Sequence, residues 1–343
     1  MRVDAYLEPT SLREVRDQAV RAERIGYDGV FSAEISHDPF LPLVTVADSA
    51  PDLLVGTAIA VAFARSPMTT AYQAWDLADL TRGRFVLGLG SQVRAHVVGR
   101  FSMPWSAPVE RMAEYIGALR AIWSSWQTGE PLRFRGESYR LSLMTPFFTP
   151  APIERPDIPI WLAAVGEGMC RLVGERCDGI HVHPFHTRRY VRDVVEPAIT
   201  SGANASGRDS AEVTRSSSIL VATGRTDREV EAAVAGVRRQ IAFYASTPAY
   251  RGVLEVSGWD VGEQLHALSR RGEWDEMTDL VSDEMVHEVA VVAPLEDLAE
   301  VVRRRTDGIL DRCGLTTMSD PGFSDDEWRA VVSAICKEPA APS

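Results

Sequence analysis

LLVGTAIAVAFARSPMTTAYQAWDLADLTRGRFVLGLG, residues 53–90, has the pattern of one strand–helix–strand unit. Residues 53–62 form a continuous run of small and β-branched apolar residues, as expected of a strand that is buried on both faces. Residues 68–83 carry a helical pattern that ends at a glycine, and 84–90 form a second buried strand. Two buried strands joined by a helix indicate a parallel sheet covered by helices.

The same alternation of strand and helix continues along the rest of the chain. Four units end by about residue 126, and further strands are predicted at 158–165 and 179–184. Residues 213–224 read as a seventh strand and 313–319 as an eighth. Eight units predict an α/β fold with a closed (β/α)8 TIM barrel, and an open doubly wound sheet is the alternative.

Two segments depart from this rhythm and predict insertions into one barrel domain of residues 1–337. Residues 131–143 alternate around Gly136, which indicates a β-hairpin. Residues 245–290 are mostly helical and exceed the needs of one barrel unit, so we expect a helical insertion before the last strand. Residues 338–343, EPAAPS, are expected to form a disordered tail.

Charge and composition limit the kind of partner that the chain can bind. The net charge of −12 opposes binding to nucleic acid and to anionic membranes, because both carry negative charge. The sequence has no signal-peptide pattern and no apolar stretch long enough to span a membrane. The four cysteines follow no zinc spacing. We therefore expect a cytoplasmic protein with reduced thiols that binds a small molecule.

The candidate site lies where the predicted strands end, since reactive groups of barrel enzymes collect at the carboxyl ends of the strands. Glycine-rich and alanine-rich ends suit a flat ligand, or a phosphate that approaches backbone N–H groups, although a glycine also fits any tight turn. The residues of interest at these ends are Glu34, His37, Asp38, Gly90, Ser91, His96, Ala164, Val165, Gly166, His181, His183, Pro184, His186 and Thr187.

Glu34 and His37 are the best candidates for proton transfer. Partial burial at a barrel mouth moves the pKa of such groups toward neutrality. For Glu34, the alternative is an ion pair with a nearby arginine. Three aromatic residues in or beside the rim loops are candidates to cover a substrate or to pack in the core, namely Phe40, Phe101 and Trp105.

Two other kinds of site receive less support from the sequence. His181, His183 and His186 are candidates for a metal site or for plain structural histidines, but we favour an organic-cofactor pocket and predict no metal. The stretch GLGSQV does not form a dinucleotide-binding fingerprint, because Val93 stands where the third glycine is required.

Six blocks resemble the bacterial luciferase-like superfamily, and within it the branch that depends on the deazaflavin coenzyme F420. The similarity runs over about residues 1–320, and the order and spacing of the blocks carry it. The blocks are GYDGVFSAEISHDPF, LLVGTAIAVAFARSPMTTAYQAWDLADLTRGRFVLGLGSQV, PVERMAEYIGALRAIW, FRGESYRL, IPIWLAAVGEGMCRLVGERCDGIHVHP and AFYASTPAYRGVLE.

The resemblance implies how these residues hold the cofactor. It places a non-proline cis peptide bond between Ala58 and Ile59, in a bulge behind the central ring, with Ala60 beside it. Glu34 is expected near the edge of the ring. The remaining cofactor contacts are a channel made by Gly90, Ser91 and His96, a phosphate or linker site at Ala164, Val165 and Gly166, and a closing side made by His183, Pro184 and Thr187.

The resemblance also implies the reaction class. We expect hydride transfer between coenzyme F420 and an organic substrate, by reduction of a C=C, C=N or C=O bond or by oxidation of an alcohol, with His37 or Glu34 handling the proton and His183 as the next choice. A monooxygenase that uses reduced FMN and oxygen is the alternative, and a binder without turnover is a third. Val93 and Ile35 replace residues typical of the sugar-phosphate dehydrogenases, which makes that substrate doubtful. The relatives also imply a homodimer.

Overall fold

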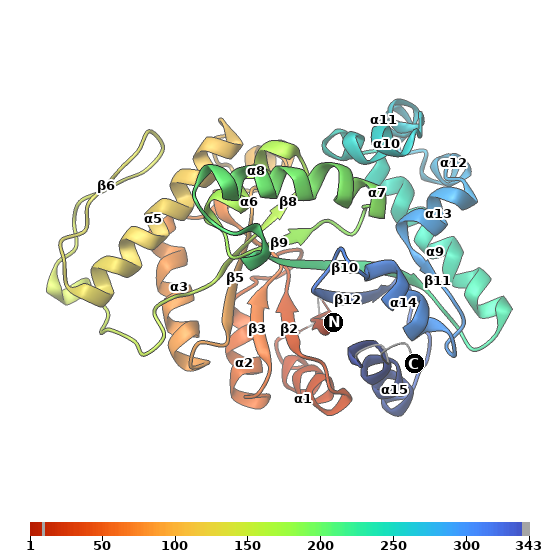
Figure 1. The fold of residues 1–343 in the computed structure, drawn as a ribbon, viewed down its shortest axis with the longest axis horizontal. Helices are drawn as coiled ribbons and strands as arrows, with labels where there is room; N and C mark the ends of the chain where they lie inside the picture. Colours follow the sequence, from red (N-terminus) through yellow and green to blue (C-terminus); the bar gives the residue numbers. More distant parts are fainter. Residues whose placement is uncertain (9–10, 338–343) are drawn as a thin grey trace.

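Eight parallel strands close into a barrel in the computed structural model, which describes residues 1–8 and 11–337 (Figure 1). β1 pairs with both β2 and β12, and β10 pairs with both β9 and β12, so the predicted TIM barrel is confirmed. The tail 338–343 lies outside the described residues. The barrel strands are β1 (Arg2–Tyr6), β2 (Gly29–Ser32), β3 (Leu54–Thr57), β5 (Phe85–Gly90), β8 (Ile160–Ala164), β9 (Gly179–Val182), β10 (Thr214–Ala222) and β12 (Arg312–Thr317).

Helices cover the outside of the barrel, which explains why strands such as β2, β5 and β9 are buried along their whole length. No helix among the described residues is both long and apolar enough to cross a bilayer. The helices are α1 (Val15–Ile25), α2 (Leu41–Ser49), α3 (Pro67–Leu80), α4 (Arg94–Gly99), α5 (Pro108–Thr128), α6 (Glu167–Arg176), α7 (Arg188–Tyr190), α8 (Glu196–Ala205), α9 (Asp227–Ala245), α10 (Arg251–Ser257), α11 (Gly262–Arg271), α12 (Trp274–Asp279), α13 (Asp283–Val289), α14 (Leu298–Thr306) and α15 (Asp325–Cys336).

The apolar run predicts one continuous strand over 53–62, but the structure does not have one. The third strand divides into β3 and a short β4 (Ala60–Val61), which both pair with β5. The peptide bond between Ala58 and Ile59, which joins the two parts, is cis, as the resemblance implies. After β4, Ser66 caps α3 by accepting a hydrogen bond from the Thr69 N–H, and Pro67 opens the helix.

Both predicted insertions have the expected kind of structure. β6 (Phe134–Arg135) and β7 (Arg140–Leu141) pair as an antiparallel hairpin, on a loop that extends away from the barrel. α10 to α13 precede the last strand and gather on the opposite side of the molecule (Figure 1). They lead into a short strand, β11 (Val291–Val292), which lengthens the sheet beside β10 and was not predicted.

The helical spacing of Leu12, Val15, Ala19, Ala22 and Ile25 in the sequence predicts a first helix over residues 11–26, and this start is earlier than the structure shows. Val15, Ala19, Ala22 and Ile25 form the buried stripe of α1, but Leu12 precedes the helix and is 50% exposed. A turn over the residues before Val15 breaks the helical phase, so the side chain of Leu12 does not continue the stripe.

Two glycines allow α6 and α8 to pack with their backbones in close contact. A methyl group at Gly174 would lie 2.0 Å from the carbonyl oxygen of Ile199, and one at Gly202 would lie 2.0 Å from that of Arg171. We expect Gly174→Ala to lower the free energy of unfolding by about 3 kcal/mol, because backbone atoms cannot yield as a flexible side chain does.

Urea unfolding measures this change, with Gly99→Ala as the control. A methyl group at Gly99 would meet no atom within 4 Å. We expect the control to change the free energy of unfolding by less than about 1 kcal/mol. A Gly174→Ala protein as stable as the control would show that the two helices are not packed as described.

Candidate active site

A floor of small residues links the ends of three neighbouring strands at the mouth of the barrel. A methyl group at Gly90 would lie 2.8 Å from Cδ1 of Ile59 and 3.5 Å from Cβ of Ala163. One at Gly88 would lie 1.7 Å from the carbonyl oxygen of Thr57. These glycines therefore allow close approach between β3, β5 and β8 and do not serve tight turns, and the side chain of Ile59 packs against Gly90.

Glu34 braces the bulge that contains the cis bond. Its backbone N–H donates to the carbonyl oxygen of Ile59, and its Oε2 accepts a 2.7 Å hydrogen bond from the Val61 N–H. Arg65 donates to both carboxylate oxygens, at 2.6 and 2.9 Å. The side chains of Glu34 and Arg65 are only 7% and 14% exposed. The arginine partner, which the sequence left open for Glu34, is thus Arg65, and this ion pair occupies the carboxylate.

His183 packs between two tyrosines from the segment that follows β10. Its ring stacks on Tyr250 with 4.1 Å between centroids, and meets Tyr244 edge-on at 4.7 Å. Nδ1 accepts a hydrogen bond from the Phe185 N–H at 3.1 Å, and burial lowers the pKa of His183 to about 3. The imidazole is therefore neutral near pH 7 and carries its proton on Nε2. No described residue accepts a hydrogen bond from Nε2, so His183 offers a free donor.

The other two histidines of this segment, one on β9 and one in the loop after it, lie in different surroundings. His181 packs against Phe31 and Trp161 inside the barrel, with ring centroids 5.6 and 5.2 Å apart. Nδ1 of His186 lies 2.8 Å from the carbonyl oxygen of His183, and its side chain is buried. Strand alternation does not bring them together, because β9 ends at Val182. Among the described residues, no three potential ligands gather around a metal position.

The first turn of α6 is open to an approaching group. A methyl group at Gly166, its N-cap, would meet no atom within 4 Å. The first N–H groups of a helix have no helical acceptor before them, although the Met169 N–H here donates to the Gly166 carbonyl oxygen at 3.1 Å. The Tyr190 hydroxyl fixes the preceding turn by donating to the Val165 carbonyl oxygen at 2.5 Å. Thr187 is 1% exposed, and its hydroxyl caps α7 by accepting a hydrogen bond from the Tyr190 N–H. This hydroxyl therefore stabilises the loop between β9 and α7.

The sequence profile of the luciferase-like monooxygenase family matches residues 1–312. The chain belongs to this family. An uncharacterised protein of Mycobacterium tuberculosis strain H37Rv is 49% identical over 305 residues, covering 89% of this chain and 90% of that protein. An F420-dependent glucose-6-phosphate dehydrogenase of Intrasporangium calvum is 28% identical and covers 82% of this chain and 81% of its own length.

Solved structures share the fold of this luciferase-like protein. The coenzyme F420-dependent tetrahydromethanopterin reductase of Methanopyrus kandleri superposes with a TM-score of 0.78 at 17% identity, covering 97% of this chain and 98% of its own. The sequence relatives point to an oxidoreductase or monooxygenase, and they include enzymes that depend on F420.

Several predicted contacts lie on the surface of this luciferase-like protein. His37 is exposed in the loop after β2, and His96 is exposed on α4. Ser91 is half-buried, and its hydroxyl donates to the carbonyl oxygen of Gln92.

The three aromatic candidates differ in their burial. Phe40 packs in the core, whereas Trp105 is half-buried against Phe63. Phe101 is also half-buried and lies beneath the Arg100 guanidinium.

Sequence reasoning missed three side chains that shape this site. Arg65 stands in the polar bend after β4, and its only signal was its position at a strand end. Tyr244 and Tyr250 stand in AFYASTPAYRGVLE, which carried the family resemblance without a role for either ring. The three residues act through contacts with Glu34 and His183, which are distant in the sequence.

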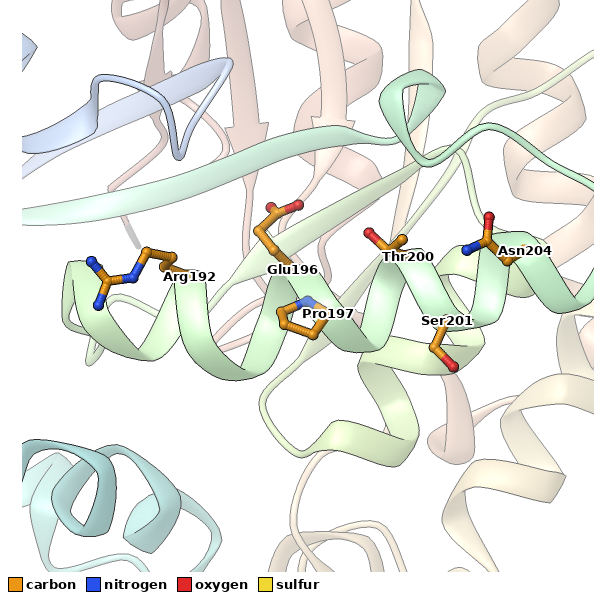
Figure 2. Close-up of a pocket in the computed structure, with 6 residues that line it drawn as sticks. All are labelled: Arg192, Glu196, Pro197, Thr200, Ser201 and Asn204. Carbon is orange, nitrogen blue, oxygen red and sulfur yellow. The ribbon is translucent and has the colours of Figure 1, made fainter.

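A broad hollow of about 640 Å³ lies on the outer face of α8 and the turn before it (Figure 2). Arg192, Thr200 and Asn204 line it from one helical stretch. Glu196, between them, pairs with Arg215 at 2.8 Å. The charged side chains of the hollow are paired, and the hollow is open to solvent, so we assign the hollow no role in the site.

The buried histidines predict that the protein loses stability in acid. Burial lowers the pKa of His181 to about 4 and the pKa values of His183 and His186 to about 3, against about 6.5 in the unfolded chain. At pH values between the folded-state pKa and the unfolded-state pKa of a histidine, the unfolded chain binds a proton that the folded chain does not. The stability is therefore complete above pH 6.5 and falls as the pH drops toward 4, by up to about 1.4 kcal/mol per pH unit for each histidine.

Urea unfolding at a series of pH values measures this slope. The matched control is His96→Gln, an exposed histidine, which should leave the slope unchanged. His186→Gln should reduce the slope of the free energy of unfolding against pH, between pH 6.5 and 4.5, by up to about 1.4 kcal/mol per pH unit, which corresponds to one proton. A slope that His186→Gln leaves as unchanged as His96→Gln does would contradict the burial of His186.

Proposed function

We propose that this protein is an oxidoreductase that uses coenzyme F420 to transfer a hydride to or from an organic substrate. The observation that carries the proposal is the continuous floor from Ile59 through Gly90 to Ala163, which leads to the open first turn of α6. A floor of closely packed small and aliphatic residues suits a flat ring system, and a helix N-terminus favours an anion. The F420-dependent relative supports this cofactor over FMN.

When bound, the deazaflavin supplies the carbon that donates or accepts the hydride. The chain supplies a rigid back wall, in which Glu34 and Arg65 hold the bulge at Ala58 and Ile59. The first turn of α6 after Gly166 would hold the phosphate of the cofactor. Ala60, Ala164, Val165 and Pro184 lie in or beside these elements and remain proposed cofactor contacts, as do Ser91 and His96.

We assign the interaction with the substrate to His183. Its neutral imidazole donates a hydrogen bond from Nε2, and such a donor polarises a carbonyl or imine toward hydride addition without changing its own charge. Glu34 is a poor proton donor because Arg65 and the Val61 N–H occupy its carboxylate. His37 stays a second candidate, since it is exposed in the loop after β2.

A turnover screen tests this function. The purified protein is mixed with reduced F420 in the absence of oxygen and offered ketones, enones and imines, while the appearance of oxidised deazaflavin is followed. In parallel, reduced FMN and oxygen are supplied with the same compounds. Turnover with F420 alone supports hydride transfer, whereas substrate-dependent oxygen consumption with FMN would make the protein a monooxygenase.

A further inference from the structure

A pocket rich in arginine lies between the start of α7, the segment from α13 to β11, and α14. Its volume is about 290 Å³. Arg188, Arg304, Arg305 and His287 line it together with apolar residues of β11 and α14, and no acidic side chain is part of the lining. This pocket is separate from the first turn of α6, where we place the cofactor phosphate.

Arg305 is buried at this pocket without a carboxylate partner. It is 9% exposed, and its Nη2 donates to the carbonyl oxygens of His186 and Glu288 at 2.8 and 3.1 Å. Its Nε and Nη1 are buried and have no hydrogen-bond partner among the described residues. Burial lowers the pKa of Arg305 to about 10, although the charge of Glu288 acts in the opposite direction. A buried charge that lacks a counter-ion is costly, so a negative ligand would relieve this site.

Two further arginines stand at the same pocket. Arg188 donates to the carbonyl oxygens of Arg304, Arg305 and Asp307, which holds its guanidinium at the end of α14. Arg304 is exposed, and neither Arg188 nor Arg304 forms an ion pair within the described chain. Cations at a helix C-terminus are favourable by themselves, and this accounts for Arg188 and Arg304. It does not account for the unpartnered nitrogens of Arg305.

We propose that this pocket binds the phosphate or carboxylate group of a small metabolite. Guanidinium groups recognise both oxyanions through paired N–H donors, and the absence of acidic side chains from the lining leaves their charge uncompensated in a protein of net charge −12. Arg305 forms the buried end of the site and Arg304 its rim, while the end of α14 holds Arg188 in place.

Calorimetric titration of the protein with inorganic phosphate, at constant ionic strength maintained with sodium chloride, tests the proposal. Succinate in a parallel titration distinguishes a phosphate from a carboxylate preference. We expect Arg304→Ala to weaken binding by about tenfold, which is about 1.4 kcal/mol, and Arg305→Met to abolish it. Arg303→Ala is the matched control, because Arg303 stands on the same helical turn but does not line the pocket.

Phosphate binding that survives both Arg304→Ala and Arg305→Met would overturn the proposal, as would heats no larger than those of chloride. Binding that is lost on Gly166→Asp and kept in the arginine variants would assign the ion to α6 and would also overturn it. If Arg305→Met does not fold, the comparison of Arg304→Ala with Arg303→Ala decides. None of these outcomes depends on turnover, so the proposal stands or falls separately from the function proposed above.

Discussion

Arg65→Ala is expected to lower the free energy of unfolding by about 3–5 kcal/mol, because it leaves the buried carboxylate of Glu34 without its counter-ion. Glu34 also holds the Val61 N–H, so the loss of its partner disturbs the bulge at Ala58 and Ile59. We therefore expect the affinity for coenzyme F420 to fall by at least about tenfold. Urea unfolding and a fluorescence titration measure the two effects.

Two variants control this experiment. Arg100→Ala removes an exposed guanidinium that donates to the neighbouring Ile35 carbonyl oxygen, and should change the stability by less than about 0.5 kcal/mol. Glu34→Gln combined with Arg65→Met removes both charges, and should recover at least half of the stability that Arg65→Ala loses. A double variant no more stable than Arg65→Ala would show that the ion pair is not the source of the effect.

His183→Phe is expected to lower kcat by about 10²–10³-fold on any carbonyl or imine substrate that the screen identifies. Phenylalanine keeps an aromatic ring against Tyr250 and Tyr244 but removes the Nε2 donor. The affinity for F420 should therefore change by less than about threefold, since the effect is on substrate polarisation. Steady-state kinetics and a cofactor titration separate the two.

His37→Ala is the matched comparison for His183→Phe. His37 is exposed, and we expect its removal to change kcat by less than about twofold. A large loss with His37→Ala and none with His183→Phe would return the proton-handling role to the loop after β2. His183→Phe should also reduce the acid dependence of stability by up to one proton, which tests the buried, neutral state of His183 without any substrate.

The sequence was most informative where a structure depends on local periodicity. Alternating strands and helices predicted the barrel, and the stripe of Val15, Ala19, Ala22 and Ile25 predicted the buried face of α1. The apolar run at 53–62 has no local feature that interrupts it, so periodicity alone predicted one continuous strand. The cis bond between Ala58 and Ile59 was expected only from the family resemblance.

The chemistry of the site depends on contacts between distant residues, which one sequence does not specify. Glu34 and Arg65 are 31 residues apart and meet because β2 and β3 are neighbours in the barrel. His183 and Tyr250 meet only after β10 and α9 return the chain to the end of β9. The sequence therefore supplied the candidate residues, while closure of the barrel determined that Glu34 is paired and His183 is neutral.

The measurement that tests the central claim most directly is a side-by-side equilibrium titration of the purified protein with coenzyme F420 and with FMN, followed by ligand fluorescence. The proposed function predicts that F420 binds at least about tenfold more tightly, a difference of about 1.4 kcal/mol. Arg65→Ala should weaken that binding, because it loosens the back wall of the site. Tighter binding of FMN, or binding of neither ligand, would contradict a deazaflavin-dependent hydride transfer.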